Sequence, residues 1–64
     1  MMEFVVDYYC MAHGKRPGGR GMWGFSTKRN PVDEDIFWTY GGYGEAKAAA
    51  RRHFAGESRV YVMT

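Results

Sequence analysis

Apolar residues recur at every second position along four short stretches of the chain, a spacing typical of β-strands. The predicted strands comprise residues 3–12, 22–28, 36–40 and 59–63. Gly24 interrupts the second strand, which predicts a bulge or a close approach of another group to the backbone. In the third strand, Trp38 lies on one face and Phe37 on the other, so both faces are partly apolar.

Residues 45–55 instead predict an α-helix. Four alanines lie in the body of this segment, and Glu45 in its first turn favours the same structure. Gly56 stands where a left-handed C-terminal cap is expected. The apolar stripe of the helix comprises Ala46, Ala49, Ala50, His53 and Phe54. Small alanine side chains let such a helix approach a sheet that supplies bulky aromatic residues.

The element order predicts an α+β fold, with a four-stranded, mainly antiparallel sheet and one helix on one face (β-β-β-α-β). The first two connections suggest an antiparallel meander, and the last strand returns through the helix to a place at or beside the first. We expect residues 1–64 to form a single domain. The predicted core comprises Phe4, Val6, Tyr8, Trp23, Phe25, Trp38, Ala46, Ala50, Phe54, Val60 and Val62.

Two polar segments separate these elements. Residues 13–21 contain four glycines and a proline and predict a long, mobile, basic loop. Residues 29–35 predict a turn that Asn30-Pro31 begins and three consecutive acidic residues keep in water.

Size and composition exclude several classes of protein. A domain of 64 residues has little room for a deep catalytic pocket, so we expect a non-enzymatic binding protein. The sequence contains no apolar run long enough to span a membrane, and its start lacks the basic region of a signal peptide. Its single cysteine rules out an internal disulfide, which favours a reducing, cytoplasmic setting.

Charge is segregated along the chain although the net charge is only +2. Residues 13–30 carry five basic side chains and no acid, whereas residues 31–45 carry four acids and no base. This polarity suits a partner with complementary patches. It is weaker than the broad positive field typical of nucleic-acid-binding proteins.

The residue types favour a protein interface. The chain contains five Tyr, two Trp, five Met and twice as many Arg as Lys, and interfaces are enriched in these types. One helix covers only one face of a sheet, so the opposite face, with Val5, Thr39 and Met63, is expected to bind a partner or a second copy of the chain. The candidate partner-binding residues are Tyr9, Met11, Phe37, Tyr61, Arg59, Lys15, Arg16, Arg20, Arg51 and Arg52.

Three motifs could in principle bind a nucleotide, a metal ion or a phosphate-binding partner. Residues 19–24 match G-x-G-x-x-G, but they lead into a strand, so a flexible loop explains them better than nucleotide binding. Cys10, His13 and His53 lack the spacing of a zinc site, and we expect no metal, cofactor or catalytic residue. The acidic run 33–35 suits a solvated turn better than a metal site or a phosphate mimic.

The basic RPGGRGMW segment, the aromatic IFWTYGGY segment and the EAKAAA helix start make residues 15–54 resemble the AP2-type DNA-binding domain. The resemblance implies three antiparallel strands before a helix, and readout of the DNA major groove through the face of the first two strands. Independently, Lys15, Arg16 and Arg20 could neutralise phosphates while Trp23 or Tyr9 stacks on bases. A small DNA- or RNA-binding module is therefore the alternative function.

The leading hypothesis is a stoichiometric protein-binding inhibitor or regulator that covers the working surface of a protein or nucleoprotein complex. Small stand-alone proteins of this kind are frequent among phage-encoded antagonists of host defence, including anti-CRISPR proteins. This expectation rests on size and class and not on a motif.

Overall fold

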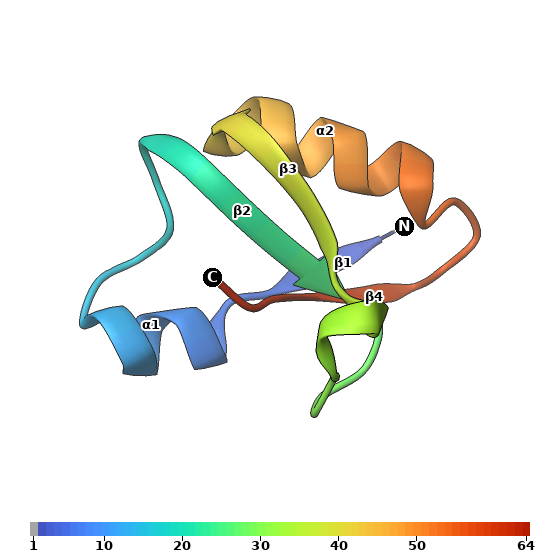
Figure 1. The fold of residues 1–64 in the computed structure, drawn as a ribbon, viewed down its shortest axis with the longest axis horizontal. Helices are drawn as coiled ribbons and strands as arrows, with labels where there is room; N and C mark the ends of the chain where they lie inside the picture. Colours follow the sequence, from blue (N-terminus) through green and yellow to red (C-terminus); the bar gives the residue numbers. More distant parts are fainter. Residues whose placement is uncertain (1) are drawn as a thin grey trace.

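Strand β2 (Arg20–Ser26) lies inside a four-stranded sheet of order β1-β4-β2-β3 (Figure 1) in the computed structural model, which describes residues 2–64. β2 pairs antiparallel with β3 (Phe37–Gly42) and with β4 (Arg59–Val62). β1 (Glu3–Val5) pairs with β4 in parallel. The fold is therefore α+β with a mixed sheet, which confirms the predicted class and the position of the last strand beside the first.

Helix α2 (Tyr43–His53) follows β3 directly and lies across one face of the sheet (Figure 1). Its start is fixed by Glu45, whose Oε1 accepts a hydrogen bond from the backbone N–H of Gly42 at 3.0 Å. Beyond its end, Gly56 has a φ of +95°, the left-handed conformation expected there. Residues 14–19 form no helix or strand, so the basic loop lies where the sequence predicts it, and its mobility stays a prediction.

The predicted strand over residues 3–12 is wrong beyond its first three residues. The strand ends at Val5, and α1 (Asp7–His13) follows, ended by Gly14 in the left-handed conformation with a φ of 70°. Two signals for this helix are in the sequence: Asp7 in the first turn and a glycine just past the last. The aromatic pair Tyr8-Tyr9 fits the strand alternation as well, which explains the error.

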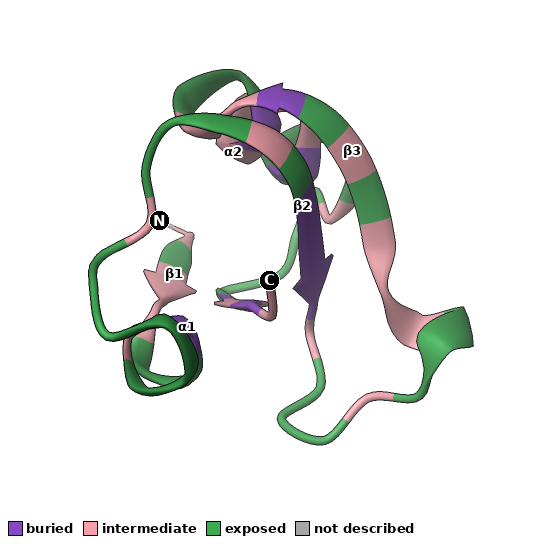
Figure 2. Ribbon diagram, turned by 60° about the vertical axis from the view of Figure 1, so that its left-hand side comes forward, coloured by how far each residue is buried: buried purple, intermediate pink, exposed green. Residues whose placement is uncertain are grey.

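The two faces of β3 are the reverse of the prediction. Phe37, expected on the open face, packs on the helix side, with its ring stacked 4.2 Å from His53 and edge-on to Phe54 at 6.1 Å. Trp38, expected in the core, is 45% exposed on the opposite side. Figure 2 shows this alternation along β3, whereas the second half of β2 is buried throughout.

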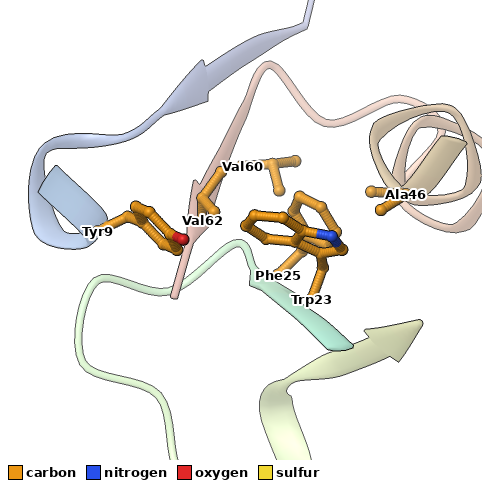
Figure 3. Packing of buried hydrophobic residues seen from close by; sticks show 7 residues of the cluster. Tyr9, Trp23, Phe25, Ala46, Val60 and Val62 are labelled. Atoms are coloured by element: carbon orange, nitrogen blue, oxygen red, sulfur yellow. The ribbon is translucent and has the colours of Figure 1, made fainter. Parts of the chain in front are cut away.

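The core fills the space between the sheet and the two helices (Figure 3). Trp23 packs against both helices: its ring centroid lies 5.5 Å from that of Tyr9 in α1 and 4.9 Å from that of Tyr43 in α2. The Trp23 indole N–H donates to the Gly41 carbonyl at 3.0 Å, so the buried polar atom has a partner. The buried apolar residues are Tyr9, Trp23, Phe25, Ala46, Ala50, Val60 and Val62.

Most of the predicted core is confirmed. Six of the predicted residues are fully buried, and Phe4, Val6 and Phe54 are half-buried against them. The prediction that Tyr8 and Trp38 lie in the core is wrong. Tyr8 is 55% exposed, because in α1 it lies on a different side from its buried neighbour Tyr9. Tyr9, expected on the binding surface, takes its place in the core.

Truncating Phe25 to Ala is expected to destabilise the fold by about 3–5 kcal/mol, because this fully buried ring leaves a cavity that a small core cannot close. Urea denaturation followed by circular dichroism measures the change. Val32→Ala, at a residue that is 62% exposed, is the control and should change stability by less than about 0.5 kcal/mol. An unaltered midpoint for Phe25→Ala would contradict the core described here.

Candidate functional site

Large apolar side chains gather on the face of the sheet opposite α2, which we call the open face. Met22 and Tyr40 are cross-strand partners there, and Trp38 lies two residues from Tyr40 on the same side of β3. Met22 is 56% exposed and Tyr40 is 70% exposed. Exposed aromatic and methionine side chains concentrated on one face are typical of an interaction site.

Trp38 is held on this face by the absence of a side chain at Gly24. The two residues are direct partners across β2 and β3. A Cβ added at Gly24 would lie 2.9 Å from Cζ3 of Trp38 and 3.0 Å from Cγ2 of Ile36. The indole therefore lies close to the backbone of β2, which is the close approach that the sequence predicts at this glycine.

A groove runs beside Trp38 and consists of two adjoining pockets, each of about 340 Å³. The Trp38 pocket is lined by Tyr8, Arg29, Asn30, Pro31, Asp33, Ile36, Trp38, Met63 and Thr64. The Tyr61 pocket is lined by Val5, Asp7, Tyr8, Met11, Arg29, Asn30, Tyr61 and Met63. The shared wall comprises Tyr8, Arg29, Asn30 and Met63. We call the two pockets together the open-face groove.

The segment between β2 and β3 supplies one wall of the open-face groove. An ion pair and a hydrogen bond to Asp35 link parts of this segment to each other. Lys28 Nζ lies 3.2 Å from Asp35 Oδ1, and Asp35 Oδ2 also accepts from the Val32 backbone N–H at 3.4 Å. The acidic run forms a single 3-10 turn, Asp33–Asp35. Arg29, Asn30 and Pro31 lie inside this closed segment and line the groove.

Two arginines are near Tyr61: Arg29 lines the same pocket, and Arg59 is on the same strand. Arg59 and Tyr61 are two residues apart on β4 and share the open face. Hydrogen bonding by Arg59, and then by Arg29, holds the pKa of the Tyr61 phenol below its usual range. Arg59 Nε also lies 3.3 Å from Glu3 Oε1, on the neighbouring strand β1. Both partners of this ion pair are more than half exposed, so it is weak.

The residues predicted to bind a partner separate into those that line or adjoin the groove and those that do not. Met11, 83% exposed, and Tyr61 line the groove, and Arg59 is adjacent. The predicted place of Tyr9 on the open face is wrong, because its ring is buried against Trp23 and His13. The predicted place of Phe37 there is also wrong, because its ring stacks on His53 of α2.

The remaining predicted basic residues lie elsewhere and do not form one surface with Tyr61. Lys15 and Arg16 are exposed in the loop before β2, and neither lines the groove. Arg20 lies 3.6 Å from Glu45 at the start of α2. Arg51 and Arg52 are exposed in the last turn of α2, and the Arg51 guanidinium lies 5.2 Å from the Phe4 ring.

Sequence reasoning missed several residues of the open-face groove. Tyr8 and Trp38 were placed in the core, and Arg29 and Asn30 were read only as part of a turn. The signal for Trp38 was present, since a glycine at the partner position leaves space for a large ring. No local pattern brings Arg29 next to Tyr61, because their proximity depends on the path of the whole 27–36 segment.

Metal-ligating side chains form no cluster among residues 2–64. His, Cys, Asp and Glu side chains do not gather there in groups of three or more that would suit a metal ion. Cys10 is a free, half-buried thiol in α1. In the same part of the chain, neither helix has the length and apolar character that a membrane crossing requires.

Comparisons with protein-family models, curated proteins and solved structures found no match. The resemblance to the AP2-type domain also fails in the topology. Within residues 15–54, only β2 and β3 precede α2, and the third antiparallel neighbour, β4, comes from the end of the chain. The strand arrangement that the resemblance implies is therefore absent from that segment.

Replacing Arg59 or Arg29 by Gln is expected to raise the pKa of Tyr61 toward its ordinary value of about 10. Each arginine favours the phenolate, so its loss makes the phenol harder to ionise and moves ionisation to higher pH. NMR titration of the tyrosine Cζ resonances measures the shift. Arg52→Gln, which removes an arginine distant from the groove, should leave the Tyr61 titration unchanged.

Gly24→Ala is expected to destabilise the protein by about 1–3 kcal/mol, since the added methyl overlaps the Trp38 ring. Trp fluorescence and near-UV circular dichroism should change with it, because Trp38 must move. Gly44→Ala, inside α2 with nothing within 4 Å of the new methyl, should instead stabilise by about 0.5–1 kcal/mol. Equal effects at the two glycines would contradict the packing of Trp38 against β2.

Proposed function

We propose that this protein acts without catalysis, as a protein-binding inhibitor or regulator whose open face covers part of a partner's surface. The observation that carries the proposal is the cluster of exposed Trp38, Tyr40 and Met22 beside a groove with walls of Tyr8 and Met63. Aromatic and methionine side chains supply contact area and adaptable packing at protein interfaces. A phage-encoded antagonist of a host defence complex fits the small size of the chain.

The distribution of exposed apolar side chains supports this function. Apart from Val32, every large hydrophobic side chain that is strongly exposed in residues 2–64 lies on the open face or on α1 beside it. On the face covered by α2, the apolar side chains are either buried in the core or half-buried against it. A partner that covers the open face would remove these apolar side chains from water, and each strongly buried aromatic can anchor an interface.

A nucleic-acid-binding module is the second candidate, and one observation favours it. Arg29 and Arg59 lie on the same face as Trp38, Tyr40 and Tyr61, and ring stacking with nearby basic groups binds single-stranded nucleic acids. The two candidates differ in salt dependence. Binding to phosphates weakens steeply as salt rises, whereas an interface with aromatic anchors weakens much less.

Affinity capture from the lysate of the native host, with and without nuclease, tests the proposal. We expect one protein to be retained in stoichiometric amount in both conditions. With that partner purified, Tyr40→Ala should weaken binding about thirtyfold or more, the loss of a central anchor of about 2 kcal/mol. Val32→Ala, at a residue that is similarly exposed but lies outside the open face, should bind as the unaltered protein does.

Three outcomes would contradict the proposal. Retention that disappears with nuclease would favour the nucleic-acid candidate. Normal binding by Tyr40→Ala, together with loss of binding on charge reversal at Arg51 and Arg52, would transfer the interface to α2. Sedimentation that shows a dimer lost in Tyr40→Ala, with no other partner retained, would show that the open face binds a second copy of the chain.

A further inference from the structure

The wall shared by the two pockets contains an arginine that has no ion-pair partner among residues 2–64. Arg29 lines both pockets, and it forms no ion pair with any residue in the 2–64 range. Arg59, two residues from Tyr61 on β4, has one ion pair, the exposed contact with Glu3. A guanidinium without a carboxylate partner is well suited to bind an oxyanion from another molecule.

Donors other than the arginines converge at the same place. Asn30 and Tyr61 line the Tyr61 pocket with Arg29, and their side chains have an amide and a hydroxyl that can donate hydrogen bonds. The pocket walls next to them are apolar, from Val5, Met11 and Met63. An anion here would therefore lie between hydrogen-bond donors and a largely apolar lining, which strengthens a charged hydrogen bond relative to open water.

The charges at the two ends of the groove restrict the ligand further. Asp7 lines the Tyr61 pocket and Asp33 lines the Trp38 pocket, while Arg29 lies in the wall they share. Neither aspartate forms an ion pair in the described part of the chain. A nucleic-acid backbone repeats its charge at every nucleotide and would bring phosphates against these acids. A ligand with one anionic group and apolar neighbours avoids that repulsion.

From this arrangement, which rests on the proposed protein-binding function, we propose that Arg29, Arg59 and Tyr61 form a carboxylate subsite in the open-face groove. The segment that binds there is an extended peptide of the partner with a single acidic side chain, an Asp or Glu that meets Arg29. Apolar side chains two residues before and two residues after that acid lie on the same side of the extended chain, and they occupy the Trp38 pocket and the Tyr61 pocket.

Two capped probe peptides, acetyl-Phe-Ala-Glu-Ala-Leu-amide and acetyl-Phe-Ala-Gln-Ala-Leu-amide, test the subsite directly. Each is titrated into the isotope-labelled full chain, and amide and methionine-methyl resonances are followed by NMR. We expect the Glu probe to bind about fivefold more tightly than the Gln probe, as one exposed ion pair contributes. Shifts should concentrate at Arg29, Tyr61 and Met63.

Variants separate the subsite from general attraction to a basic protein. Arg29→Gln and Arg59→Gln should each reduce the preference for the Glu probe toward equal binding. Arg52→Gln, which removes the same charge outside the groove, should keep it. Equal binding of the two probes to the unaltered chain, or absence of shifts at millimolar concentration, would overturn the subsite. Tighter binding of an eight-residue oligothymidylate to the same residues would replace it with a nucleic-acid site.

The captured partner distinguishes failure of the subsite from failure of the proposed function. If Tyr40→Ala loses the partner while Arg29→Gln and Arg59→Gln keep it, the open face binds protein but the carboxylate subsite is wrong. If all three variants keep the partner, the open face is not the interface and both proposals fail. If all three lose it while Arg52→Gln keeps it, both are supported.

Discussion

The packing of Trp38 against the backbone at Gly24 is the contact on which both the sheet and the groove depend. Because Gly24 has no side chain, the Trp38 ring from β3 can lie against the centre of β2. Residues 23–26 of β2 are all buried, with Trp23 and Phe25 in the core on the α2 side. Once Trp38 lies on the open face, strand alternation places Phe37 on the other side, where it meets His53 and Phe54. One missing side chain thus sets the orientation of β3 and positions a wall of the groove.

The two helices share the work of closing the core and leave the open face uncovered. α2 can lie close to the sheet because its contact residues, Ala46 and Ala50, are small and fully buried. α1 is only seven residues long and contributes one buried ring, Tyr9. A helix this short cannot cover a sheet, but its outer side, with Tyr8 and Met11, extends the apolar surface of the open face. The exposed apolar area follows from the number and length of the helices.

Sequence patterns predicted the parts of the fold that local chemistry determines. The alanine-rich helix, β2, β4 and most of the core follow from propensity and alternation. The orientation of β3 could not be derived that way, because its two faces are almost equally apolar and a partner on another strand decides between them. α1 was missed because Tyr8 and Tyr9 fit both periods. Of the candidate site, Met11, Tyr61 and Arg59 were found, whereas Arg29 depends on a tertiary contact that no local pattern records.

If the open face binds a partner, the positions of its charged residues would make that binding selective. Most basic side chains outside the groove either have a partner, as Arg20 and Lys28 do, or lie in the loop before β2 and on α2. Arg29 lies instead between two apolar pockets, with an aspartate in each. An apolar surface alone would accept many partners, but Arg29 with an acid on either side would disfavour ligands that misplace or repeat their negative charge. Hydrophobic contacts would then supply most of the affinity, and Arg29 with its two flanking acids would decide which segment is accepted.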